Sequence, residues 1–129
     1  MVSSADAHMP DILLICHDSR PYLSLIHTLS NSYAVTVCTR FEGIKKKIAE
    51  QVFDLLIIEH VPNDNIVMRA LEMCRPATQQ GARVILINGH PRKEFIAAAF
   101  AHGLCDYFPA PVQQELLLER VQSLLKESW

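Results

Sequence analysis

Three short groups of side chains in this sequence have the chemistry of a metal or acid–base site. They are Cys16-His17-Asp18, Glu59-His60 and Asn88-Gly89-His90. Thiolate, imidazole and carboxylate ligands together suit Zn²⁺ or another transition metal better than Mg²⁺, which prefers oxygen ligands. No local ligand spacing supports a metal, so such a site requires a fold that brings the three histidines together. The simpler interpretation is that these are separate loop histidines.

The three groups stand at or just after the ends of short apolar runs that have the composition of strands. Five such runs occur, bounded by polar, Pro or Gly residues: Ile12–Cys16, Ala34–Cys38, Leu55–Ile58, Val84–Ile87 and Cys105–Phe108. The segments between and after them carry apolar residues at helical spacing. These stripes are Tyr22/Leu25/Ile26/Leu29, Phe41/Ile44/Ile48, Ile66/Ala70/Cys74, Phe95/Ala98/Ala99/His102 and Leu117/Val121/Leu124/Leu125.

Strands that alternate with helices predict right-handed βαβ units on one parallel sheet. The first, third and fourth runs are continuously apolar, as central strands must be, whereas the second and fifth are mixed. This predicts a flavodoxin-like three-layer α/β sandwich with strand order 2-1-3-4-5. The functional crevice of such a sheet lies at the carboxyl ends of its strands, where the three polar groups fall.

Composition limits the function classes. The chain has 129 residues, enough for one domain, which we place at residues 10–129 after a flexible lead of residues 1–9. The net charge of −2 argues against a nucleic-acid partner, and the Lys45–Lys47 run beside Arg40 is interpreted as a solvated helix face. No apolar run approaches the roughly 20 residues of a membrane span, and no signal peptide is recognisable, so a cytoplasmic protein is expected.

Two further features exclude common chemistries. The four cysteines (Cys16, Cys38, Cys74 and Cys105) are widely spaced and are predicted to be buried thiols. The first glycine of the chain is Gly43, so no glycine-rich loop follows the first strand to hold a nucleotide or flavin phosphate. No cofactor is therefore predicted.

Four stretches resemble the receiver domain of response regulators, the CheY-like superfamily. They are Ile12–Asp18, Phe53–Glu59, Val84–Gly89 and Gly103–Pro111, and the final segment Glu115–Leu125 is similar to the usual last helix of that family. The resemblance covers about Pro10 to Lys126. It implies a role in bacterial two-component signalling or a phosphorelay.

The residues of the phosphorylation chemistry are not retained. Receivers hold Mg²⁺ with an acidic pair, accept phosphate on an Asp, and position the phosphoryl group with a Ser/Thr and a Lys. In this sequence the acidic pair falls on Cys16 and His17, the acceptor on Glu59, the Ser/Thr on Asn88 and the Lys on Ala110, with Asp18 displaced by one residue. Without a hard-oxygen metal site and a cation, transfer of phosphate is disfavoured. The resemblance therefore implies a pseudo-receiver with no catalytic residue and no metal.

Three alternatives stay open. The leading one is a non-enzymatic module that binds a protein partner or itself. The second is a ligand or metal sensor that uses the His/Cys/Glu crevice, and the third, the weakest, is a residual enzyme. Glu59 is either a stand-in for a phosphorylated aspartate or an ordinary solvated carboxylate.

The resemblance also implies a partner surface on the segment around residues 92–102, the last strand and the last helix. The predicted surface comprises Arg92, Phe95 or Ile96, Tyr107, Leu118, Glu119 and Arg120. Leu118 is expected to point to the surface, about 100° away from Leu117 around the helix axis. Tyr107 is either a residue that reorients or a half-buried edge-strand tyrosine with a solvated hydroxyl. The Ala110–Pro111 peptide bond is predicted to be cis.

Overall fold

The computed structural model describes residues 9–126, and the predicted lead of residues 1–9 lies, except for Met9, outside that range. Five parallel strands form one sheet in the order β2-β1-β3-β4-β5, which confirms the predicted fold class and strand order. The strands are β1 (Asp11–Ile15), β2 (Ala34–Cys38), β3 (Leu55–Glu59), β4 (Arg83–Gly89) and β5 (Leu104–Pro109).

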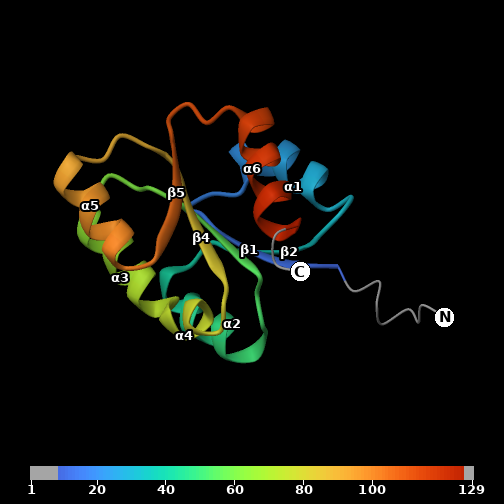
Figure 1. Ribbon diagram of the computed structural model, residues 1–129, viewed down its shortest axis with the longest axis horizontal. Coiled ribbons are helices and arrows are strands. Elements are labelled where there is room, and N and C mark those ends of the chain that lie inside the picture. The colour runs from blue at the N-terminus through green and yellow to red at the C-terminus, as the bar shows by residue number, and fades with distance from the viewer. Residues whose placement is uncertain (1–8, 127–129) are drawn as a thin grey trace.

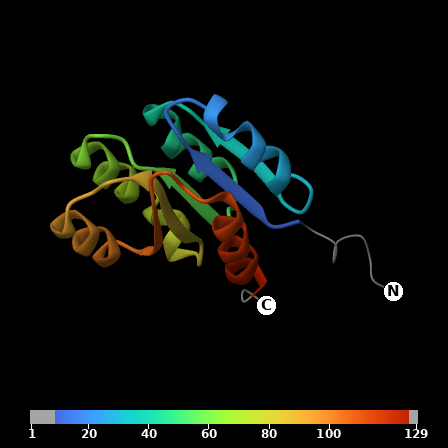
Figure 2. The same ribbon diagram turned by 90° about the horizontal axis from the view of Figure 1, so that it is seen from above.

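Helices cover both faces of the sheet (Figure 1). The α-helices are α1 (Leu23–Leu29), α2 (Ile44–Glu50), α3 (Asp64–Met73), α4 (Arg75–Gln79), α5 (Lys93–Ala101) and α6 (Gln114–Lys126), and short 3₁₀ turns, Arg20–Tyr22 and Phe41–Gly43, precede α1 and α2. The helices α1 and α6 lie on one side, and the helices α2 to α5 lie on the other. From above, the strands show the twist that is usual for a parallel sheet (Figure 2).

Two apolar layers fill the space between the sheet and its helices. Alternate residues of the central strands point to opposite faces, so that Ile12 and Leu14 pack under α1 and α6, while Leu13 and Leu56 pack under α2 to α5. Because both faces are covered, β1, β3 and β4 are almost continuously buried. This rigid arrangement fixes the carboxyl ends of β1, β3 and β4 beside one another.

Two of the predicted helical stripes need correction. Ala70 and Cys74 are buried, but Ile66 is 41% exposed in the first turn of α3, where it borders an open cavity. Phe95 and Ala99 face the core, whereas Ala98 is half-buried and His102, after the last turn of α5, is exposed. By contrast, Leu117, Val121, Leu124 and Leu125 are all buried, as the spacing predicts.

Candidate functional site

Glu59, the last residue of β3, is the centre of a hydrogen-bonded network at the carboxyl edge of the sheet. The backbone N–H of His17 donates to Glu59 Oε1 at 2.8 Å, and the Tyr22 hydroxyl donates to Glu59 Oε2. The side-chain amide of Asn88 donates to the same Tyr22 hydroxyl at 2.9 Å. Both carboxylate oxygens therefore have a protein donor, and Glu59 is not the free, solvated carboxylate that the sequence allowed.

Tyr22 is the site residue that the sequence did not reveal. Its position in the stripe with Leu25 and Leu29 predicts a core residue, and the residue is 3% exposed. A buried tyrosine still needs a partner for its hydroxyl, and here that hydroxyl lies between Glu59 and Asn88. Burial, together with the bond to Glu59, raises the pKa of Tyr22 well above its usual value, so the phenol remains a proton donor.

The three residues after β1 diverge and do not form one site. Cys16 is buried, and desolvation followed by the charges of Glu59 and Asp18 raises its pKa to about 11. The side chain of His17 is exposed. Asp18 pairs with Arg20 at 2.6 Å, and this hydrogen bonding lowers the pKa of Asp18 to about 2. Asp18, the acidic residue of this group, is thus already paired with Arg20.

The ends of β4 and β5 are tied together through Gly89. Its carbonyl oxygen accepts hydrogen bonds from the Tyr107 hydroxyl at 2.6 Å and from the Ala110 backbone N–H at 3.1 Å. Tyr107 is half-buried, as expected of an edge-strand tyrosine. Its hydroxyl, however, donates to a protein carbonyl and is not simply solvated. The Ala110–Pro111 bond is cis, which confirms that prediction. Asn88 has a φ of 65°, a left-handed conformation that asparagine tolerates better than most residues.

The three histidines of the metal hypothesis do not converge on one set of ligands, although His60 and His90 line the same small pocket. His60 packs its ring edge against Phe95 and places Nε2 2.9 Å from Asp64 Oδ1, while His90 is exposed in the next loop. Within residues 9–126, no group of three or more His, Cys, Asp or Glu side chains is arranged to hold a metal ion. The metal alternative therefore has no support from the geometry.

Two members of the predicted partner surface are placed differently. Phe95 is 6% exposed and belongs to the core. Leu118 is half-buried, on the side of α6 that faces α1. This side is identified by Gln114, one turn earlier, whose side-chain amide lies 3.4 Å from Ser24 Oγ on α1. The exposed leucine of α6 is Leu116, at 49%.

The other members of that surface are exposed or half-buried residues of α6, β5, α5 and the loop before α5. Arg120 is one turn after Leu116 and pairs with Asp106 of β5 at 2.9 Å, which shows that this side of α6 faces β5. Glu119 and Arg92 are exposed, and Ile96 is half-buried on α5, one turn before the 46% exposed Phe100. We use the name β5 edge face for the exposed and half-buried residues of α5, β5 and α6 that we consider for a partner: Ile96, Phe100, Tyr107, Leu116, Glu119 and Arg120.

Burial predicts an order of thiol reactivity. Burial raises the pKa of Cys16 to about 11 and that of Cys74 to about 12, so the reactive thiolate of either residue is a minor species at pH 8. Cys38 is buried, whereas Cys105 is half-exposed. Iodoacetamide should therefore modify Cys105 first, as peptide mass mapping can check, and rapid modification of Cys16 at pH 8 would contradict the burial described here.

Solved structures share this fold. A CheY-like receiver domain protein from Methanospirillum hungatei is 22% identical, with a TM-score of 0.75 over 92% of this chain and 95% of that chain. A response regulator from Burkholderia pseudomallei, solved with a phosphorylated aspartic acid and a calcium ion, is 21% identical, with a TM-score of 0.73 over 92% of this chain and 70% of that chain. A CpaE pilus assembly protein from Burkholderia thailandensis is 18% identical, with a TM-score of 0.72 over 92% and 99%.

These likenesses establish the fold of this chain as that of receiver domains. No protein-family model and no curated protein matches the sequence. Among residues 9–126, no helix has the length and apolar character needed to cross a membrane.

Proposed function

We propose that this protein is a pseudo-receiver, a cytoplasmic module of bacterial signal transduction that binds a protein partner or a second copy of itself and does not accept phosphate. The observation that carries the proposal is the closed network of Glu59, Tyr22 and Asn88. In this network the residue at the acceptor position has both carboxylate oxygens engaged by protein donors. The two donors fix the direction of the carboxylate and draw electron density from both of its oxygens, which makes it a weaker and less adaptable nucleophile for in-line attack on a phosphoryl group.

The surroundings of Glu59 support the same proposal. Cys16 and His17 offer no hard oxygen ligands for Mg²⁺, and Ala110 has no cation to stabilise charge on a transferred group. Tyr22 provides a hydroxyl between the β3 and β4 ends, where it links Glu59 to Asn88 without any ligand. These hydrogen bonds tie the end of β3 to the end of β4 through the protein's own side chains, which supports a site that works without phosphate.

The β5 edge face is the surface we propose for the partner. It combines exposed apolar side chains, Phe100 and Leu116, with the half-buried Tyr107 and with charged groups around them. Apolar residues that are rimmed by charges are typical of protein interfaces, and symmetric dimers are the commonest assemblies. The receiver and pilus assembly proteins of the same fold support a role in regulation or assembly over one in catalysis.

Leu116→Glu should weaken association with the partner or with a second copy by about tenfold or more, because it places a charge in the apolar part of the face. Leu23→Glu is the matched control, since Leu23 is 59% exposed on α1. Sedimentation equilibrium measures self-association of both variants. A pull-down, followed by titration with any captured protein, measures their affinity for a partner. Loss of association in Leu23→Glu with none in Leu116→Glu would place the interface on α1 instead.

A further inference from the structure

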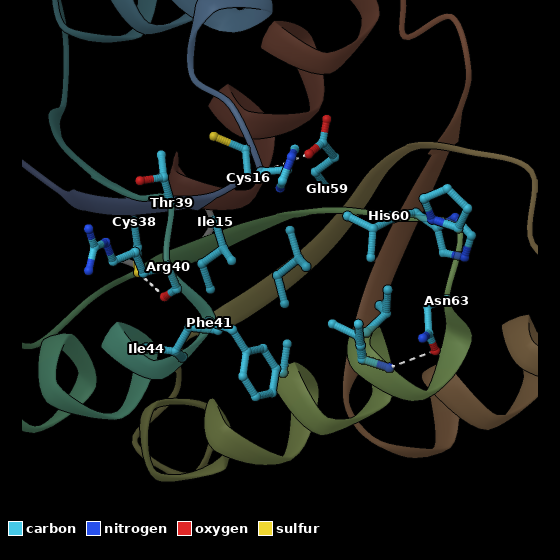
Figure 3. Close-up of a pocket in the computed structure, with 17 residues that line it drawn as sticks. Ile15, Cys16, Cys38, Thr39, Arg40, Phe41, Ile44, Glu59, His60 and Asn63 are labelled. Atoms are coloured by element: carbon cyan, nitrogen blue, oxygen red, sulfur yellow. Dashed lines mark hydrogen bonds between the residues drawn. The ribbon is translucent and has the colours of Figure 1, made fainter.

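A cavity of about 560 Å³ opens beside the Glu59 network, on the α2–α3 side of the sheet (Figure 3). Its walls come from the ends of β1 and β3, from the segment after β2, and from α2 and α3. The inner walls are apolar, and they include Ile15, Phe41, Ile44, Ile58, Val67 and Ala70. Its volume falls within the range of about 300–1,000 Å³ that is typical of small-molecule sites.

Several of the polar groups around this cavity are engaged by the protein or directed away from its centre. Cys38 Sγ donates to the Arg40 carbonyl at 3.2 Å, and Asn63 Oδ1 accepts from the N–H groups of Asn65 and Ile66 at the start of α3. Figure 3 shows the Glu59 carboxylate and the Arg40 guanidinium directed away from the apolar side chains in the centre. An anionic ligand would have only the exposed Arg40 as a cationic lysine or arginine partner in the lining, so it would lose hydration in the apolar centre for little ionic gain.

The exposure of Ile66 is explained by the same cavity. In the first turn of α3, Ile66 lines the cavity and is 41% exposed, although Val67 and Ala70 beside it are buried. A large apolar side chain at the rim gains contacts when an apolar molecule enters and excludes water from it. The rim of the cavity at Ile66 is therefore apolar, as its inner walls are.

We infer that this cavity is a binding site for an uncharged, largely apolar small molecule the size of one or two fused aromatic rings. Such a ligand would join the segment after β2 to α3 and to the ends of β1 and β3, next to Glu59. The site is separate from the β5 edge face, so it stands whether or not that face binds a partner.

Titration of the ¹⁵N-labelled full chain with indole, observed by NMR, tests this inference. We expect saturable shifts at Ile15, Phe41 and Val67 and none at Leu116, together with a higher melting temperature at saturating indole. Indole-3-carboxylate, which has the same ring system and a negative charge, should bind at least about tenfold more weakly.

Ile66→Arg should weaken indole binding by about tenfold or more, because it brings a charge to the apolar rim. Ile66→Leu, which keeps the rim apolar, should leave the affinity for indole nearly unchanged, and Leu23→Arg, on the other side of the sheet, should have no effect. Both Ile66 variants change an exposed residue, so their folding can be verified by their unchanged shifts around α6. The inference is overturned by an absence of saturable shifts, by equal or tighter binding of the carboxylate, or by unchanged affinity in Ile66→Arg.

Discussion

Gly89→Ala should destabilise the protein by about 3 kcal/mol, which would lower its melting temperature by roughly 10 °C. A Cβ at this position would lie within 2.5 Å of Cβ, Cγ and Nδ1 of His60. His60 has little freedom to move, because its ring packs on Phe95 and its Nε2 contacts Asp64. Gly89 is not in the left-handed region, so the expected effect is steric and not a matter of backbone conformation. Urea denaturation followed by circular dichroism measures it.

The partner variant of this experiment is His60→Gly, which removes the atoms that a Cβ on residue 89 would meet. His60→Gly costs stability by itself, but the double variant should be less destabilised than the sum of the two single variants. Gly43→Ala is the matched control, since its Cβ would lie 3.4 Å from Cys38 Sγ, an ordinary contact distance, and it should be nearly neutral. Additive effects of the Gly89 and His60 changes would show that the two residues do not interlock.

Tyr22→Phe should destabilise the protein by about 1–3 kcal/mol, the usual penalty when a buried polar group loses its partner. The substitution keeps the ring in the core but leaves Glu59 Oε2 and the Asn88 amide without the hydroxyl that links them. Because the pKa of Tyr22 is raised, the hydroxyl is protonated throughout the neutral range, and the loss should not depend on pH between 6 and 9, roughly. Chemical denaturation at several pH values measures the effect.

Tyr33→Phe is the control for this substitution. Tyr33 is half-buried, and its hydroxyl has no hydrogen bond within residues 9–126, so removal of that hydroxyl should change stability by less than about 0.5 kcal/mol. A cycle of Tyr22→Phe with Glu59→Gln should show coupling of about 1 kcal/mol or more. If Tyr22→Phe were as silent as Tyr33→Phe, the network would not hold this edge of the sheet together.

The sequence was sufficient for the fold because the relevant signals are strong. Continuous apolar runs identify strands that are buried on both faces, and the mixed composition of Ala34–Cys38 and Cys105–Phe108 identifies the two edges of the sheet. Both features depend only on which strands are buried, and the apolar or mixed composition of a strand indicates its burial. The same signals placed Glu59 and Asn88 at the carboxyl ends of adjacent strands, as the structure has them.

The contacts within the site could not be predicted in this way. Helical spacing identifies Tyr22 as buried, but it does not say which polar group its hydroxyl reaches. In the same way, helical geometry predicts that Leu118 points away from the sheet, but it does not say to which side of α6. One side of this helix faces α1, and the other faces β5. Only the packing of the neighbouring elements shows that Leu118 lies on the first side and Leu116 on the second.

Incubation of the full chain with acetyl phosphate and Mg²⁺, followed by intact-mass measurement, tests the central claim of a pseudo-receiver most directly. A phosphorylatable receiver domain treated in parallel shows that the reagent is active, and Glu59→Gln shows whether any adduct depends on the candidate acceptor. We expect no phosphate adduct on this protein, because both Glu59 oxygens accept hydrogen bonds from the protein, Cys16 and His17 offer no side-chain oxygen to Mg²⁺, and Ala110 carries no cation. A stoichiometric adduct that disappears in Glu59→Gln would contradict the account and would identify the protein as a working receiver.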